Sequence, residues 1–317
     1  MQHFALILFV NKTKGEKMEF KSGFVTIIGD TNAGKSTLLN SLIGEKIAIV
    51  SPKSQTSRHN TIGVYNDEDS QIVFIDTPGY HKIKHKLDEF MQDNIDNASE
   101  GVDVLVFLID GKKPLREQYE KLYEAQGKSN AKKILCINKI DETTFEKLYP
   151  QLDELNKICK TDEILPISAL KGKNLDVLIN MIKKYLPSYS QEMLYYPREQ
   201  FTDKNVRFLA SEIIREKVLL DYEDEIPHGV AVQVIEFEET DTLATISADI
   251  FCERDSHKMI IIGHNGEKIK SLSIHCRKSL EKLLDKKVML NLFVKVKPNW
   301  RVNNSMLEEF GYFNENE

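Results

Sequence analysis

A glycine-rich stretch near the beginning of the chain constrains its fold more than any other feature. Residues 29–36 read Gly-Asp-Thr-Asn-Ala-Gly-Lys-Ser and match the phosphate-binding pattern G-x-x-x-x-G-K-[ST]. An apolar, strand-like run precedes the stretch at 24–28, and a helix-like run follows it at 37–43. In that context, backbone N–H groups of the loop and the helix N-terminus bind a di- or triphosphate. The residues expected to contact the nucleotide here are Gly29, Asp30, Thr31, Asn32, Ala33, Gly34, Lys35, Ser36 and Thr37.

The same region supplies groups for phosphate chemistry. The ammonium group of Lys35 is expected to reach the outer phosphates, and the hydroxyl of Ser36 is expected to ligate Mg²⁺. A carboxylate, Asp76, ends the buried-strand pattern at 71–75 and is expected to hold the Mg²⁺ through the other ligands of the ion. A glycine soon after it offers an N–H to the γ-phosphate, although this run alone is typical of an ordinary turn. The run consists of Asp76, Thr77, Pro78 and Gly79.

A loop between these two motifs has the composition of a switch. Residues 55–60 read Gln-Thr-Ser-Arg-His-Asn, and a hydroxyl of Thr56 or Ser57 would bind Mg²⁺ only while the γ-phosphate is present. The sequence does not decide between the two hydroxyls, and a solvated Ser/Thr loop is the alternative. The side chains expected to carry the reaction are Lys35, Thr56, Ser57, Asp76 and Gly79, and those expected to hold the metal are Ser36, Thr56, Ser57 and Asp76.

A further motif indicates which base is bound. The run 134–137 is apolar and is followed by Asn138, Lys139, Ile140 and Asp141, which therefore lie at the carboxyl end of a strand. The carboxylate of Asp141 can accept hydrogen bonds from guanine N1–H and the 2-amino group, which adenine does not offer. Such sites reject analogues that lack the bonded group by about 10⁴ to 10⁵, so GTP is expected rather than ATP. At another strand end, backbone N–H groups can meet guanine O6, and the residues there are Ser168, Ala169 and Leu170.

Two positions bear on the rate of hydrolysis. Tyr80 stands where Ras-like proteins place the glutamine that orients the attacking water, so hydrolysis is expected to be slow or differently assisted. Asn32 stands where some related GTPases use an asparagine to hold a K⁺ ion beside the phosphates. That ion would supply positive charge, and a loop-stabilising role for Asn32 is the alternative.

Composition and charge exclude some classes of protein and partner. The 317 residues, 41% of them hydrophobic, suffice for two cores, and no apolar stretch approaches a membrane span. The four cysteines lack metal-ligand spacing and are expected to be reduced. Residues 204–253 hold four basic and twelve acidic side chains, whereas 254–301 hold twelve basic and four acidic ones. Despite the formal net charge of −6, this asymmetry predicts a localised polyanion site in the last third of the chain.

That last third has the α-β-β-α-α-β pattern of a KH type II domain. Its helices are expected at 206–220, 256–262 and 267–284, and its strands at 230–237, 244–252 and 288–297. The turn Gly263-His-Asn-Gly266 matches the GXXG loop, whose backbone clamps about four nucleotides. For each lysine alone, a solvated position is the simpler interpretation. The residues expected to bind single-stranded RNA, in preference to DNA, are Gly263, His264, Asn265, Gly266, Lys268, Lys270, Arg277, Lys278, Lys295 and Lys297.

These patterns divide the chain. The first domain has six strand-like runs that alternate with helical patterns, which predicts a doubly wound, mostly parallel α/β sheet with the nucleotide at its carboxyl edge. An α+β KH type II domain follows. The expected parts are an N-terminal extension at 1–20, of which 1–17 are dispensable, a GTPase domain at 21–187, a linker at 188–203, the RNA-binding domain at 204–301 and a C-terminal tail at 302–317.

From about residue 20 onward, the chain resembles the Era family of bacterial ribosome-assembly GTPases, within the TrmE-Era-EngA-Septin-like class. The most specific stretches are 55–59, 207–217, 261–270 and 294–301. The resemblance implies a monomeric, cytoplasmic protein that hydrolyses GTP to GDP and phosphate. It further implies binding to the 3′ end of 16S rRNA, a role in assembly of the 30S ribosomal subunit, and peripheral contact with the inner membrane.

The chain departs from the family pattern in three places. Asp30-Thr31 replaces an Arg-Pro pair, Ser57 replaces the second threonine of the switch, and His264-Asn265 replaces a more basic Lys-Gly pair. The last change is expected to lower RNA affinity because neutral histidine carries less charge than lysine. Two competing functions remain: a tRNA-modification GTPase that shares the first domain, and an RNA-binding module with a structural nucleotide.

Overall fold

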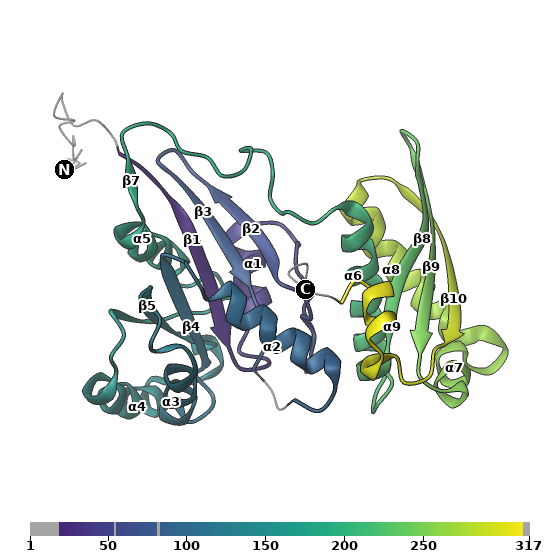
Figure 1. The fold of residues 1–317 in the computed structure, drawn as a ribbon, viewed down its shortest axis with the longest axis horizontal. Coiled ribbons are helices and arrows are strands. Elements are labelled where there is room, and N and C mark those ends of the chain that lie inside the picture. The colour runs from purple at the N-terminus through teal and green to yellow at the C-terminus, as the bar shows by residue number, and fades with distance from the viewer. Residues whose placement is uncertain (1–18, 54, 81–82, 313–317) are drawn as a thin grey trace, which may run out of the picture.

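The chain folds into two lobes joined by an extended connector, as Figure 1 shows. The computed structural model describes residues 19–53, 55–80 and 83–312. Residues 1–18 of the expected extension, and residues 313–317 of the expected tail, lie outside the described part of the chain. None of the helices formed by the described residues is long and apolar enough to cross a bilayer.

The first lobe is built on a mostly parallel sheet in the order β2-β3-β1-β4-β5-β6, with β7 paired to β1. Two pairings are antiparallel, β2 with β3 and β7 with β1. The parallel pairings bring the carboxyl ends of β1, β3 and β5 to one edge, so Gly29, Asp76 and Asn138 lie near each other there. The strands are β1 (Phe20–Gly29), β2 (Thr61–Asn66), β3 (Ser70–Asp76), β4 (Val104–Asp110), β5 (Lys132–Asn138), β6 (Glu163–Pro166) and β7 (Ser188–Tyr189).

Helices cover both faces of this sheet, which confirms the doubly wound α/β prediction. Helices α1 and α5 pack on one face, and α2, α3 and α4 pack on the other. The central strands are therefore buried on both faces, which explains why β4 is a continuous apolar run with every residue buried. The helices are α1 (Lys35–Ile43), α2 (Lys86–Ala98), α3 (Leu115–Gln126), α4 (Phe145–Ile158) and α5 (Leu175–Tyr185).

The second lobe has the predicted α-β-β-α-α-β order. Its three strands pair in the order β10-β9-β8, with β9 parallel to β10 and antiparallel to β8. Helices α6 and α8 cover one face of this sheet around a single apolar cluster. The elements are α6 (Val206–Asp221), β8 (Ala231–Glu239), β9 (Leu243–Cys252), α7 (Asp255–Ile262), α8 (Glu267–Leu284), β10 (Lys287–Val296) and α9 (Asn304–Glu309). Short 3₁₀ turns lie at Ile140–Glu142, Pro227–Gly229, His264–Gly266 and Trp300–Val302.

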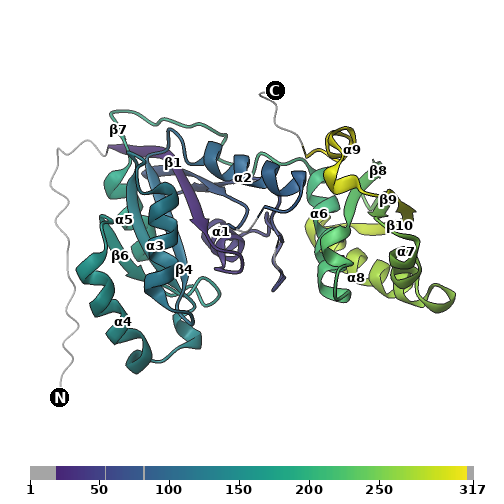
Figure 2. The same ribbon diagram turned by 60° about the horizontal axis from the view of Figure 1, so that its bottom comes forward.

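The two lobes meet through an apolar cluster of their own. It joins α2 of the first lobe to β8, β9 and the chain beyond Trp300 in the second. Figure 2 shows α9 beside the upper end of α6. The connector is bonded to the sheet edge, since the Val64 N–H donates to the Phe201 carbonyl at 2.9 Å and the Gln71 amide donates to the Tyr196 carbonyl at 2.8 Å.

Candidate functional site

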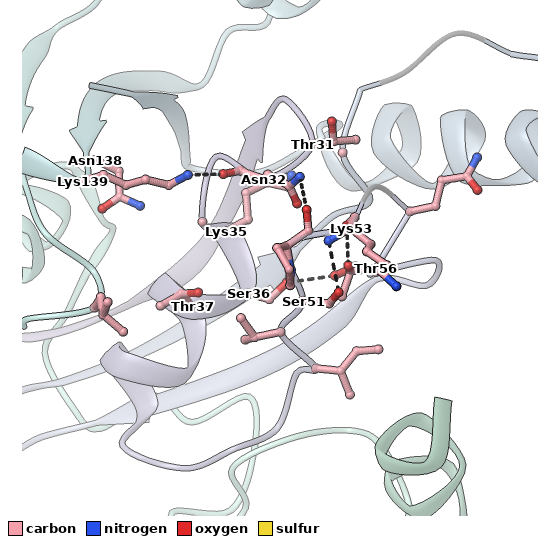
Figure 3. A pocket seen from close by; sticks show the side chains of 18 of the residues that line it. Thr31, Asn32, Lys35, Ser36, Thr37, Ser51, Lys53, Thr56, Asn138 and Lys139 are labelled. Atoms are coloured by element: carbon pink, nitrogen blue, oxygen red, sulfur yellow. Dashed lines mark hydrogen bonds between the residues drawn. The ribbon is translucent and has the colours of Figure 1, made fainter. Parts of the chain in front are cut away.

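A cavity of about 460 Å³ lies at the carboxyl edge of the first sheet, around the N-terminus of α1. The phosphate-binding loop forms its centre, with Asn138 and Lys139 on one side and Ser51, Lys53 and Thr56 on the other (Figure 3). The predicted residues that line it are Thr31, Asn32, Gly34, Lys35, Ser36, Thr37, Thr56, Ser57, Gly79, Asn138, Lys139, Asp141 and Leu170.

Two glycines let the backbone come close enough to form this cavity. Gly34 has φ 101°, a left-handed conformation, and directly precedes α1. Gly79 lies against Thr31, and a Cβ added there would come within 2.8 Å of the Thr31 backbone nitrogen. The loop after β3 therefore approaches the phosphate-binding loop at a distance that only glycine allows.

The buried side chain of Lys35 lies across the base of the phosphate-binding loop. Its Nζ donates to the carbonyl oxygens of Gly29 and Asp30, each at 3.1 Å. Burial lowers the pKa of Lys35, while the nearby carboxylates of Asp76 and Asp30 oppose that shift. A negatively charged phosphate at the loop would act in the same direction as these carboxylates and favour the charged ammonium.

Three oxygen-bearing side chains converge beside Lys35. The Ser36 Oγ donates to Asp76 Oδ2 at 2.7 Å and lies 2.8 Å from the Ser57 Oγ. Asp76 Oδ1 is buried and has no hydrogen-bond partner among the described residues. Burial raises the pKa of Asp76 to about 6, although the charge of Lys35 opposes the rise. Clustered hydroxyl and carboxylate oxygens are the donors that Mg²⁺ prefers, so this set fits the ion.

The two hydroxyls that the sequence left undecided are placed differently. Whereas Ser57 faces Ser36, the Thr56 Oγ1 donates to the backbone carbonyl of Lys53 at 2.7 Å. The Thr56 carbonyl in turn accepts from Arg215 of the second lobe. In this arrangement, Ser57 lies with Ser36 and Asp76, the other residues expected to hold the metal, and Thr56 stabilises the turn before it.

The base-recognition residues lie together at the other end of the cavity. The Ser168 Oγ donates to Asp141 Oδ1 at 2.6 Å, and this bond holds the pKa of Asp141 below its usual range. The Lys139 Nζ donates to the Asn32 carbonyl at 2.6 Å and pairs with Asp110 at 2.8 Å. The carboxylate expected to read guanine is therefore oriented by a neighbouring loop and kept ionised.

Other predicted residues support the cavity from behind and do not line it. Tyr80 is one of them, because its ring packs in the apolar cluster around α2, α3 and β4, and only its backbone meets the loop, at Gly29. Burial raises the pKa of the Tyr80 hydroxyl to about 12. The Asp30 carboxylate pairs with Lys121 of α3, and the Thr77 hydroxyl donates to the Ile27 carbonyl at 2.9 Å. The supporting residues are Gly29, Asp30, Ala33, Asp76, Thr77, Pro78, Tyr80, Ile140, Ser168 and Ala169.

One wall of the cavity was missed by motif reasoning. Residues 49–53 line it, and the Asn32 Nδ2 donates to the Pro52 carbonyl at 2.6 Å. This segment is irregular and matches no phosphate-binding pattern. The only sequence signal was its position between α1 and the Ser57 loop.

The chain that continues beyond this wall, at residues 58 and 59, contacts the second lobe. The Arg58 guanidinium, 1% exposed, donates to the carbonyls of Val230 at 2.8 Å and His228 at 3.1 Å, and to the Tyr312 hydroxyl at 3.1 Å. The next side chain, His59, stacks on Tyr312 with ring centroids 4.8 Å apart. The loop that carries Ser57 is thus part of the contact between the lobes.

A second site surrounds the GXXG turn. Gly263 has φ 74° and Gly266 has φ 78°, and a Cβ on Gly263 would come within 2.7 Å of Lys268. His264 and Asn265 lie exposed between them. Next to the turn, a groove of about 440 Å³ separates α8 from β10, and its residues include Ile274, Arg277 and Phe293.

The basic residues predicted for RNA fall into two groups. Lys268, Lys270, Arg277 and Lys278 are exposed along α8, and Lys270 and Arg277 line the groove. Lys295 and Lys297 instead lie in ion pairs, with Asp249 at 2.6 Å and Glu309 at 3.4 Å. The apolar lining of the groove, including Ile274 and Phe293, was not predicted.

Comparison with known proteins matches both lobes. Residues 24–139 match the family described as 50S ribosome-binding GTPase, and residues 225–301 match the family described as KH domain. GTPase Era of Clostridium beijerinckii is 43% identical over 295 residues, which cover 92% of this chain and 98% of that protein. GTPase Era of Clostridium botulinum (strain 657 / Type Ba4) is 44% identical over 300 residues, which cover 93% and 99%.

Two crystal structures are similar over the same extent. One is Era in complex with MgGDPNP and nucleotides 1506–1542 of 16S ribosomal RNA, with a TM-score of 0.87 and 39% identity over 92% of this chain and 99% of that chain. The other is a variant of Aquifex aeolicus Era bound to GDP and AlF4⁻, with the same TM-score, identity and coverage. The paired lobes, the nucleotide cavity and this similarity along the chain show that the protein belongs to the Era family of GTPases.

Proposed function

We propose that this protein is a GTP-hydrolysing switch that binds the 3′ end of 16S rRNA and acts in assembly of the 30S ribosomal subunit. One observation carries the proposal: Ser57 lies beside Ser36 and Asp76 in the nucleotide site, while the next residue, Arg58, bonds to Val230 and His228 of the RNA-binding lobe. A movement of Ser57 on loss of the γ-phosphate would therefore also move Arg58, which is bonded to the second lobe.

In this proposal, the residues of the cavity divide the work of binding. Lys35 and the backbone of residues 29–34 hold the phosphates, and Asp141 accepts from guanine. Asn138 Nδ2 gives one hydrogen to the Ala33 carbonyl at 2.9 Å and has a second hydrogen to offer to the base. The Mg²⁺ ion, when bound, neutralises charge on the phosphates. Ser36 and Ser57 ligate it, and Asp76 orients the Ser36 hydroxyl.

Hydrolysis proceeds without a glutamine at position 80. Asn32 uses its Nδ2 to bond the Pro52 carbonyl at 2.6 Å, so its Oδ1 is the side-chain atom that would bind a cation. A K⁺ ion held by this oxygen would supply positive charge beside the phosphates, and equal turnover in KCl and NaCl would rule that role out. Gly79 contributes its backbone N–H to the γ-phosphate.

The second lobe is the RNA-binding part of this proposal. Single-stranded RNA is clamped at residues 263–266, its bases occupy the groove between α8 and β10, and its phosphates meet Lys268, Lys270, Arg277 and Lys278. The similarity to Era crystallised with nucleotides 1506–1542 of 16S ribosomal RNA supports this choice of partner. The expected domain bounds, the cytoplasmic location, the monomeric state and the peripheral membrane contact remain predictions from the sequence.

The test is binding of a fluorescent oligonucleotide with the 16S rRNA 3′-end sequence, with GDP or a non-hydrolysable GTP analogue, at fixed salt. Tighter binding with the analogue, lost in Gly266→Asp, is expected, because Gly266 has φ 78°, where aspartate strains the GXXG turn, and the new carboxylate repels the RNA phosphates. Equal affinity in both nucleotide states would contradict the switch.

Turnover separates the proposal from its main competitor, an RNA-binding module with a structural nucleotide. The competitor predicts no steady-state release of phosphate, whereas the proposal predicts release that is lost in Lys35→Ala. A tRNA-modification GTPase is disfavoured by the second lobe, whose residues 225–301 match the KH family.

A further inference from the structure

The nucleotide cavity has a wall that the second lobe holds in place. Of the residues in that wall, Val50, Pro52 and Lys53 belong to an irregular segment that lies against α6. The Lys53 Nζ donates to the carbonyl of Tyr222, the residue directly after α6. The Val50 N–H donates to Glu216 Oε1 at 3.0 Å. An acidic side chain of the RNA-binding lobe thus fixes the backbone of the nucleotide pocket.

Glu216 is placed as a structural anchor. It is 2% exposed, and its Oε2 accepts from Lys46 at 2.6 Å and from Lys217 at 3.1 Å. Burial opposes its ionisation, but the bonds from Lys46 and the Val50 N–H hold the pKa of Glu216 below its usual range. Removing a hydrogen-bond partner from the buried Glu216 carboxylate would cost more free energy than breaking an ion pair at the surface. The bonds of its two oxygens to Val50 and Lys46 therefore hold this part of the chain firmly.

The segment then passes this constraint to the phosphate-binding loop. Two residues beyond Val50, the Pro52 carbonyl accepts from Asn32 Nδ2 at 2.6 Å. Asn32 has φ 63°, a left-handed conformation that asparagine adopts more readily than most residues, and the bond to Pro52 helps to hold its side chain. A continuous series of contacts therefore runs from Glu216 through Val50 and Pro52 to Asn32.

We propose that Glu216 is a positioning residue for GTP hydrolysis, supplied by the RNA-binding lobe, that sets the wall Val50–Lys53 and through it Asn32. The inference rests on the proposed function and deepens it. It means that the nucleotide site is complete only when α6 is docked on it, so displacement of the second lobe by RNA would alter turnover without any contact between RNA and nucleotide.

The test compares Glu216→Gln with Glu223→Gln in the full-length protein. Glutamine at 216 keeps an acceptor for the Val50 N–H but loses the charge that binds Lys46. Glu223 is an exposed acid two residues beyond α6, so its variant makes the same charge change outside the contact. We expect kcat for GTP to fall at least about tenfold in Glu216→Gln, which is an increase of about 1.4 kcal/mol in the activation free energy. In Glu223→Gln, kcat is expected to stay within about twofold of the wild-type value.

Two further readouts distinguish positioning from general damage. Nucleotide-free binding of the 16S 3′-end oligonucleotide is expected to stay within about twofold in Glu216→Gln, because Glu216 does not line the groove beside the GXXG turn. GDP affinity is expected to fall by less than kcat does, because Lys35 bonds to the carbonyls of Gly29 and Asp30 and not to the wall. Should Glu216→Gln fold poorly, Lys46→Gln removes the same ion pair from a half-exposed side chain and is expected to lower kcat in the same direction. Combined in one chain, the two changes are expected to be non-additive.

The outcomes are separable. If the wild type releases no phosphate, the proposed function itself fails. If the wild type turns over and both Glu216→Gln and Lys46→Gln match it, only the positioning role is overturned. An equal loss of kcat in Glu223→Gln would also overturn the positioning role, because the loss would then result from the change in net charge and not from the contact with Val50.

Discussion

The carboxamide of Asn138 fills the space that a side chain on Gly34 would need. A Cβ built on Gly34 would lie 2.4 Å from Asn138 Nδ2. That same amide donates to the Ala33 carbonyl and accepts from the Ala169 N–H, each at 2.9 Å. One buried side chain therefore ties the phosphate-binding loop to the base-recognition loop after β6, and the glycine next to it is required for the bond.

Gly34→Ala is expected to weaken nucleotide binding. The methyl group would displace Asn138, and the loss of one or both of its bonds costs about 1–3 kcal/mol, which is roughly tenfold or more in affinity. Gly44→Ala is the matched control, since Gly44 has φ 83° but nothing within 4 Å of its Cβ position. Both variants carry about 1–2 kcal/mol of left-handed strain. Equal GDP affinities in the two variants, measured by fluorescence titration, would contradict the clash.

Ser57→Ala is expected to reduce the preference for a GTP analogue over GDP in the presence of Mg²⁺, by roughly tenfold. Thr56→Ala should leave that preference nearly unchanged, because the Thr56 hydroxyl is used by the Lys53 carbonyl. The measurement is nucleotide affinity with and without Mg²⁺ for each variant. A larger effect in Thr56→Ala would assign the metal to the other hydroxyl.

Asp141→Asn is expected to convert base preference from guanine to xanthine. An amide at this position can donate to the xanthine O2 carbonyl, whereas it no longer accepts from both guanine donors, so the original discrimination of about 10⁴ is lost. Competition between GTP and xanthosine triphosphate measures the change. Glu142→Gln serves as the control, since Glu142 lines the cavity and pairs with Lys112 at 2.7 Å. Retained GTP preference in Asp141→Asn would remove Asp141 from base recognition.

Arg277→Ala is expected to weaken RNA binding more than Lys295→Ala does. Arg277 lies exposed beside the groove, whereas Lys295 is already paired with Asp249. Losing one phosphate contact to a single strand lowers the slope of log affinity against log salt by about 0.7. A salt titration with the 16S 3′-end oligonucleotide measures each slope. The reverse ranking would place the RNA backbone along β10 and not along α8.

His59 makes the contact between the lobes sensitive to acid. Burial lowers the pKa of His59 to about 4, with Arg215 adding to the shift and Glu212 opposing it. The unfolded chain takes up this proton near pH 6.5, whereas the folded chain does so only near pH 4. The free energy of unfolding therefore falls between these values as pH falls, by up to about 3 kcal/mol from this residue.

His59→Phe keeps a ring in the stack and removes the titration. Denaturant unfolding at several pH values is expected to show a shallower loss of stability for His59→Phe than for the wild type between pH 6.5 and 4. Because the carboxylates titrate in both proteins, the difference between the two curves isolates His59. Parallel curves would mean that the His59 ring takes up its proton at the same pH in the folded and the unfolded protein.

Local patterns predicted the parts of the site that lie at strand ends. The loops after β1, β3 and β5 each follow a buried apolar run. Parallel pairing brings the carboxyl ends of these strands to the same edge of the sheet. For this reason Lys35, Asp76 and Asp141 could be assigned from their motifs. The order of helices and strands in the second lobe was also predictable from local sequence, because the apolar residues of each element recur with the period of a helix or of a strand.

Contacts between distant segments could not be predicted in this way. Arg58 and Tyr312 are 254 positions apart, and nothing in their local sequence indicates that they bond. The orientation of the Thr56 and Ser57 hydroxyls depends on Lys53 and Arg215, which lie in different lobes. The linker is bonded to β2 and β3 of the first lobe, and the segment that carries Ser57 makes the more direct contact between the lobes.

The bond between Arg58 and the Tyr312 hydroxyl also orders events during synthesis. A chain made from its N-terminus completes the sheet and the phosphate-binding loop long before Tyr312 exists. During that interval the Ser57 loop lacks the aromatic ring against which His59 stacks. The groups expected to hold the phosphates are thus synthesised early, while the docked loop, and any control exerted through it, becomes available only once the second lobe has been translated and folded.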